Sequence, residues 1–222
     1  MSEDKSSDIF TFPRWLNIAR PAIAIGALGG LLYAVLVVYL GGNPKTTDVG
    51  YRPEQPVPYS HALHVGQLGM DCRYCHNTVE VAAKAAIPPT QTCMNCHSMV
   101  RTTSEKLTPI RQSYATGMPV EWIRVHDLPD YVYFNHSAHV RRGVGCVECH
   151  GRIDTMEVVY QAKPLSMGWC LDCHRNPEAH LRPEAFITKL DWVPDEDQAV
   201  LGARLAEMNG INPPTDCNAC HR

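Results

Sequence analysis

The chain has 222 residues, a formal net charge of −3 and 45% hydrophobic residues. This length fits one domain or two small ones, and the nearly balanced charge gives no indication of a nucleic-acid partner. The chain contains 17 prolines among its 222 residues, a larger share than the usual one of about 5%, and this favours loops over long regular elements.

An uncharged, strongly apolar segment occupies residues 21–42 (PAIAIGALGGLLYAVLVVYLGG). As a helix it would extend about 33 Å, enough to cross a bilayer core of about 30 Å. A cleavable signal peptide has a shorter apolar part, of about 7–15 residues. A buried core helix would need a large apolar core, which the rest of the chain does not offer. We therefore expect a retained signal-anchor, a single transmembrane helix.

The charges around this segment predict its orientation. Arg14 and Arg20 precede it, with Lys5 further out, whereas only Lys45 lies close on the other side. Basic residues favour the cytoplasmic side, so residues 1–20 are predicted to be cytoplasmic.

Small residues recur at every fourth position of the same segment, at Ala22, Gly26, Gly30 and Ala34. Such a ridge lets a second membrane helix approach closely, which would indicate a transmembrane partner subunit. The alternative is that glycine is simply common in membrane helices.

A polar, proline-rich stretch at residues 43–58 is predicted to be a linker, and the remaining residues, 59–222, contain all ten cysteines. These form five CxxC pairs, and histidine follows every pair. The motifs are CRYCH (Cys72, Cys75, His76), CMNCH (Cys93, Cys96, His97), CVECH (Cys146, Cys149, His150), CLDCH (Cys170, Cys173, His174) and CNACH (Cys217, Cys220, His221).

CxxC alone is also found in zinc sites and redox dithiols, but neither requires the histidine that follows all five pairs. CxxCH is the attachment motif of haem c, in which two thioethers hold the macrocycle and the histidine binds the iron. The sequence thus predicts five haem c groups with the five motif histidines as proximal ligands. Residues 59–222 are too few to build a separate apolar core around each of five haems. We expect a multihaem cytochrome c made mostly of loops and short α-helices wrapped around five covalent haems, plus one N-terminal transmembrane helix.

The motif spacing indicates an internal repeat. Motif starts are separated by 21, 53, 24 and 47 residues, and YSHALHV precedes the first motif as FNHSAHV precedes the third. The halves would be about 57–130 and 131–222, with the fifth motif as an addition. Apolar spacing predicts a helix over 196–208. Residues 120–134 could hold a short extended segment, and no pattern predicts a large sheet.

Each haem iron needs a second axial ligand, and the candidates are the histidines outside the motifs: His61, His64, His126, His136, His139 and His180. Five are required if every haem has two histidines. Because the six histidines outside the motifs nearly match the five distal positions, we expect both axial positions of each iron to be filled. Such irons are closed to substrates and transfer electrons.

The stretches YSHALH and FNHSAH resemble the HxxH element of small class III multihaem cytochromes. In that class the first histidine caps the haem that follows it and the second caps the next haem along. The resemblance implies that His61 and His64 cap the Cys72 and Cys93 haems, and that His136 and His139 cap the Cys146 and Cys170 haems. The alternative for either pair is a surface or zinc-binding HxxH.

The distal ligand of the Cys217 haem departs from that class, since residues 151–169 contain no histidine. His126 is the first choice. Met156, preferred over Met167, is the alternative, and a thioether ligand would raise the potential of that haem. His180 is the next alternate after Met156, although a surface histidine is favoured over a ligand at that position.

The anchor, the five motifs in this spacing, and the stretches RVHDLPDYVYFNHSAH and PLSMGWCLDCHRNPE resemble the pentahaem cytochrome c subunit of bacterial alternative complex III. This resemblance implies a quinol-oxidising complex of the bacterial inner membrane, with polytopic quinol-binding subunits, an iron–sulfur subunit and a monohaem cytochrome. The haem domain would be periplasmic. It would relay electrons to a periplasmic cytochrome, a copper protein or a terminal oxidase, and would have no catalytic site of its own.

Two other functions remain open. A tetrahaem-type membrane-anchored quinol dehydrogenase feeding a periplasmic reductase would need a quinone site beside a haem close to the membrane. A multihaem nitrite reductase would need an open iron, often with lysine in place of a motif histidine, whereas all five motifs here end in histidine.

Overall fold

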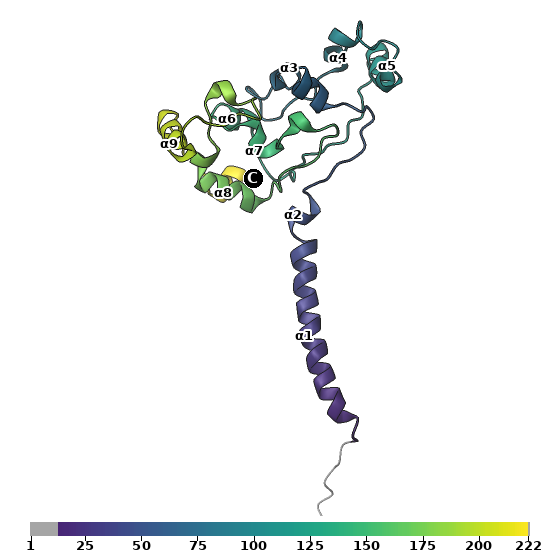
Figure 1. Cartoon of the computed structure of the whole chain (residues 1–222), viewed down its shortest axis with the longest axis vertical. Helices are drawn as coiled ribbons and strands as arrows, with labels where there is room; N and C mark the ends of the chain where they lie inside the picture. Colours follow the sequence, from purple (N-terminus) through teal and green to yellow (C-terminus); the bar gives the residue numbers. More distant parts are fainter. Residues whose placement is uncertain (1–12, 222) are drawn as a thin grey trace, which may run out of the picture. The chain divides into compact units, whose positions relative to one another are not determined.

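The computed structural model describes residues 13–221 and consists of two compact units that meet between Thr47 and Asp48. The first unit contains the long helix α1 (Leu16–Gly41) and the single turn α2 (Pro44–Thr47) (Figure 1). α1 has 26 residues and a mean hydropathy of 2.3, and none of it is buried. It is therefore long and apolar enough to cross a membrane, and it is not the core helix of a soluble domain.

α1 begins five residues earlier than the predicted segment and contains Pro21. The apolar stretch marks only the part suited to lipid, whereas Asn17, Ala19 and Arg20 are compatible with a helix and extend it outward. Arg20 thus lies in the helix. Lys5, the outermost charge used to predict the orientation, lies outside the described residues.

The predicted linker divides into two parts. Asn43 starts α2, because its side-chain oxygen accepts a hydrogen bond of 3.0 Å from the backbone N–H of Lys45. Residues 48–58 are hydrogen-bonded into the second unit, where the N–H of Gly50 donates to the carbonyl of Gln161 at 2.8 Å.

Within residues 48–221 the second unit contains short helices and loops and no β-strand (Figure 1). Its helical elements are η1 (Ala62–Gln67, π-helical), α3 (Cys72–Cys75), α4 (Thr90–His97), α5 (Thr108–Thr116), α6 (His136–Val140), α7 (Cys146–His150), α8 (Met167–Arg175), α9 (Gln198–Met208) and α10 (Cys217–Cys220), with 3₁₀ turns η2 (Glu105–Leu107), η3 (Ile153–Thr155), η4 (Pro177–His180) and η5 (Glu184–Phe186). This confirms the predicted absence of a large sheet in the described residues. Pairing in the 120–134 segment is limited to one bridge, Val132 with His221.

The helix predicted at 196–208 is confirmed as α9. It begins after Asp197, whose carboxylate accepts a hydrogen bond of 2.8 Å from the N–H of Ala199.

Few apolar side chains are buried in the second unit. Those within the described residues are Val57, Ile110, Met156, Leu181, Ile187, Leu190 and Leu201. Five of the seven follow the third motif, where loops fold over one another. Most of this unit therefore has no apolar core made by its own side chains.

Helix α9 packs on η4 through a close approach at Gly202. A Cβ atom there would stand 2.0 Å from the carbonyl oxygen of Glu178, which itself accepts a hydrogen bond from Gln198. We expect Gly202→Ala to destabilise the haem-loaded domain by about 1–3 kcal/mol, because a backbone shift outweighs the gain of about 1 kcal/mol in helix propensity.

Thermal unfolding followed by circular dichroism would measure this change. Val200→Ala is the matched control, since Val200 lies on the same helix and is 58% exposed; its unfolding temperature should stay close to that of the parent. An unchanged unfolding temperature for Gly202→Ala would show that the α9–η4 contact is not tight.

Candidate haem attachment sites

All five CxxCH motifs adopt the same local structure, a helical turn that places the two cysteines three residues apart on one face. Polar residues start several of these turns. Asp71 accepts from the N–H of Arg73, Ser166 from that of Trp169, and Asp216 from that of Ala219. Two thiols on one face of a turn can reach the same macrocycle, with the following histidine beside them.

The histidine rings are held in a way typical of metal ligands. In seven of the ten predicted ligands, Nδ1 lies within hydrogen-bond distance of a backbone carbonyl and therefore donates to it, leaving Nε2 available for a metal. These are His64, His76, His97, His136, His139, His174 and His221, with distances from 2.6 to 3.3 Å. The other three, His61, His126 and His150, each have one buried ring nitrogen without a hydrogen-bond partner.

Two pairs of these rings have the separation expected across a haem iron. The ring centroids of His64 and His97 are 6.3 Å apart, and those of His139 and His174 are 6.1 Å apart. Because a metal–imidazole bond of about 2.0–2.1 Å puts the ring centroid about 3 Å from the metal, two axial imidazoles stand about 6 Å apart. These are two of the pairs that the HxxH resemblance implies.

The internal repeat extends to the aromatic residue before each HxxH. The ring of Tyr59 is 4.8 Å from His61, edge to face, and 4.4 Å from His64, stacked. In the second half Phe134 takes the same place, at 4.7 Å and 4.6 Å from the two corresponding histidines. Such contacts fix ring orientation in both halves.

A cluster of five histidines joins the first and third motifs: His61, His76, His126, His136 and His150. Burial, and then the other histidines, lowers the pKa of His150 to about 3 and that of His61 to about 4. Burial also lowers the pKa of His126. The lowered pKa values of His61, His126 and His150 favour the neutral imidazole, which is the form that binds a metal.

His126 does not lie where its predicted role requires. Its ring contacts that of His150 in the third motif, with centroids 4.5 Å apart, instead of lying beside His221. The reason is a long-range contact, in which the Gln55 side chain bonds both the N–H and the carbonyl of Ile123. This holds the 120–126 stretch near the first HxxH. This placement favours the third motif over the Cys217 haem as the site that His126 serves.

The fifth motif rests on the segment before the second HxxH. The carbonyl of Cys220 accepts a bond of 2.8 Å from the N–H of Tyr133, and the His221 ring lies 5.7 Å from the ring of Tyr131. Met156, the alternative distal ligand, is 4% exposed and lies beside Gly151, immediately after the third motif. Its position therefore favours the third motif over the fifth.

Sequence analysis missed a polar network at the third motif. Glu148, inside CVECH, accepts hydrogen bonds from His180 at 2.8 Å and from Arg182 at 3.1 Å. Arg182 is 7% exposed, covers Gly145 and lies 5.3 Å from the Trp192 ring. His180 is a partly exposed partner of this carboxylate.

These residues fit covalent haem. Paired thiols on helical turns, imidazoles with Nδ1 held and Nε2 free, ring pairs about 6 Å apart, and a unit with little apolar core of its own are what haem c groups require. The ten cysteines and the five motif histidines would hold the haems. His64 and His139 would supply distal ligands to the Cys93 and Cys170 haems. His61 would supply that of the Cys72 haem and His136 that of the Cys146 haem, with His126 in the same cluster.

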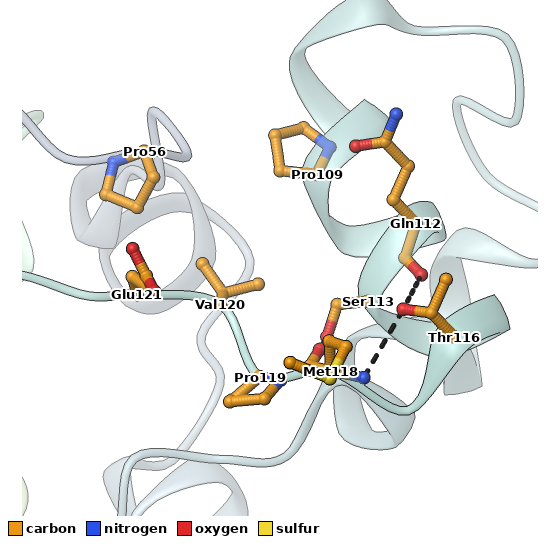
Figure 2. A pocket seen from close by; sticks show the side chains of 9 residues that line it. All are labelled: Pro56, Pro109, Gln112, Ser113, Thr116, Met118, Pro119, Val120 and Glu121. Atoms are coloured by element: carbon orange, nitrogen blue, oxygen red, sulfur yellow. Dashed lines mark hydrogen bonds between the residues drawn. The ribbon is translucent and has the colours of Figure 1, made fainter.

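A pocket of about 570 Å³ lies beside α5 (Figure 2). Figure 2 shows Pro109 and Gln112 on one side and Pro56 and Val120 on the other. Its described lining contains no cysteine or histidine, so it is not one of the haem sites.

Comparison with known proteins supports the class predicted from the motifs. Residues 132–222 match the family described as cytochrome c7 and related cytochrome c. Over 100 residues the chain is 36% identical to the menaquinone reductase, multihaem cytochrome c subunit of Nitratidesulfovibrio vulgaris (strain Hildenborough), a match covering 45% of this chain and 47% of that protein. The matched region spans about half the length of that relative. Both comparisons point to a multihaem cytochrome c for the part of the chain they cover.

Proposed function

We propose that this chain is a membrane-anchored pentahaem cytochrome c that relays electrons between a quinone-linked membrane complex and an acceptor outside the cytoplasm. The observation that carries the proposal is the geometry of the imidazoles. His64 faces His97 and His139 faces His174 at separations suited to an iron bound on both sides. When bound, each haem would accept and release one electron.

The residues of this chain would supply the rest of that function. Histidines on both faces of the irons at the second and fourth motifs would exclude substrates there and keep the ligand set unchanged on reduction, while the Nδ1 hydrogen bonds would fix the ring orientations. Helix α1 would hold the domain at a membrane. The resemblance to alternative complex III supports quinol oxidation as the electron source, with iron–sulfur, polytopic and monohaem subunits as partners.

Co-purification is the direct test. The full-length chain, extracted from its native membranes in mild detergent, should bring polytopic and iron–sulfur subunits with it, and the complex should reduce a soluble cytochrome when given quinol. If the chain is isolated alone and oxidises quinol unaided, the complex assignment is wrong, and the tetrahaem-type quinol dehydrogenase becomes the better assignment.

A second candidate function reverses the direction of electron flow. It is favoured by the relative from Nitratidesulfovibrio vulgaris, whose name describes a menaquinone reductase. Membranes containing the complex separate the two. Reduction of the haems by added quinol supports an outward relay, and rapid oxidation of pre-reduced haems by added quinone supports delivery to the quinone pool.

A further inference from the structure

We propose, resting on the function above, that the five haem sites form one unbranched row in the order second, first, third, fourth, fifth, so that the second and fifth motifs are its two ends. This order differs from the order in the sequence. It is assembled from four contacts between motifs, each carried by different residues.

The second and first motifs adjoin. The Asn95 side chain of CMNCH donates to the hydroxyl of Tyr74 in CRYCH at 3.2 Å. Cys75 also lies within electrostatic reach of Cys93. The first HxxH serves both sites, since His64 of that element pairs with His97 of the second motif.

The first and third motifs meet across the two halves. The side chains of Cys72 and Cys146 lie close to each other. On the same side, Arg141 donates to the carbonyl of Glu80 at 2.7 Å, and His136 donates to that of Ala83 at 2.9 Å. These bonds tie the start of the second half to the loop after the first motif.

The third and fourth motifs are joined by the second HxxH and by Glu148. His139 pairs with His174 of the fourth motif, while Glu148 of the third motif binds His180, just after the fourth. Cys149 lies within electrostatic reach of Cys173.

The fourth and fifth motifs are joined by His174, which donates to the carbonyl of Pro214 at 2.6 Å, three residues before Cys217. Cys170 lies within electrostatic reach of Cys220. In Figure 1 the yellow C-terminal segment lies beside α8, whereas α4 lies on the opposite side of this unit, with α3 and α7 between.

The solvent exposure of the cysteines is a separate observation that also points to the second and fifth motifs as the ends of the row. Of the ten cysteines, Cys96 and Cys217 are exposed, and the others are partly buried. One belongs to the second motif and one to the fifth. A row whose ends alone are open to solvent would let electrons enter at one end and leave at the other, with the three interior sites shielded from other partners.

The test removes one haem at a time and counts how many of the remaining haems change their midpoint potential. An oxidised haem raises the potential of adjacent haems most, because charge interactions weaken with distance. In the full-length chain, Cys93→Ala/Cys96→Ala or Cys217→Ala/Cys220→Ala should shift the midpoint potential of one remaining haem. Cys146→Ala/Cys149→Ala should shift two. Redox titration followed by electron paramagnetic resonance of the separate ferric signals gives the counts.

Ligand variants keep the test valid if a haem-deleted chain does not fold. His64→Met at the end site should alter its own haem and one neighbour, whereas His139→Met at an interior site should alter its own haem and two neighbours. Met99→Leu, at a position that is 84% exposed near the second motif, is the control and should shift none.

The row would be overturned if loss of the haem at the second or fifth motif shifted the midpoint potentials of two remaining haems. It would also be overturned if loss of the haem at the third motif shifted three. The intact mass of each preparation separates this outcome from failure of the proposed function. A parent chain carrying five covalent haems but giving other counts refutes the order alone, and a parent chain carrying fewer refutes the pentahaem proposal.

Discussion

His64→Ala and His139→Ala should each convert one haem to a high-spin form, about one fifth of the total, and raise the midpoint potential of that haem. Both rings face a motif histidine at the separation of an axial pair, and both are fixed through Nδ1 by a carbonyl four residues earlier. Visible absorption and electron paramagnetic resonance of the oxidised protein would measure the change.

Added imidazole should restore the low-spin spectrum of both variants, because it can fill the position that the side chain left. A purely structural role would not respond to imidazole. Leu68→Ala is the control, since Leu68 is 63% exposed at the end of the same segment. If His64→Ala stays fully low-spin without imidazole, His64 is not an axial ligand.

Replacing residues 1–47 by a cleavable secretion signal should release the chain completely from membranes while leaving its haem content unchanged. Helix α1 is the described helix with the length and composition to cross a bilayer, and residues 48–221 form a compact unit of their own. The variant is expressed in a host without the partner complex, and haem is measured in soluble and membrane fractions.

Gly26→Leu/Gly30→Leu in the intact anchor is the matched control. Apart from the neighbouring backbone of the helix itself, no described atom lies within 4 Å of the added Cβ positions, so the helix tolerates the change and should stay in the membrane. When the same variant is expressed in the native host instead, loss of the co-purifying polytopic subunit would show that the small-residue ridge contacts a partner helix. A secreted chain that still sediments with membranes would contradict the anchor role of α1.

The parts predicted correctly from the sequence depend on local signals. The helix at α9 follows from apolar spacing, and the motif turns follow from the CxxCH pattern itself. The HxxH resemblance also predicts the pairing of His139 with His174, whose ring centroids lie 6.1 Å apart, because that element spans only one helical turn and can reach two neighbouring sites.

What the sequence could not reveal depends on contacts between distant segments. His126 lies at the third motif because Gln55 binds the backbone of Ile123, 68 residues away. Arg182 and Glu148 are 34 residues apart and meet only once the loop after the fourth motif folds back. No spacing rule encodes such contacts, since loop closure costs little more for long loops than for short ones.

The distal ligand of the Cys217 haem shows the same limit. The sequence favoured His126, and the structure places that residue elsewhere. His221 instead faces the segment around Tyr131, which carried no ligand signal in the sequence.

The intact mass of the full-length chain, purified from native membranes and denatured without reductant, tests the central claim most directly. We expect the mass of the polypeptide plus five covalently bound haems, with no free thiol among the ten cysteines. A mass short of five haems, or thiols that react with a maleimide after denaturation, would contradict it.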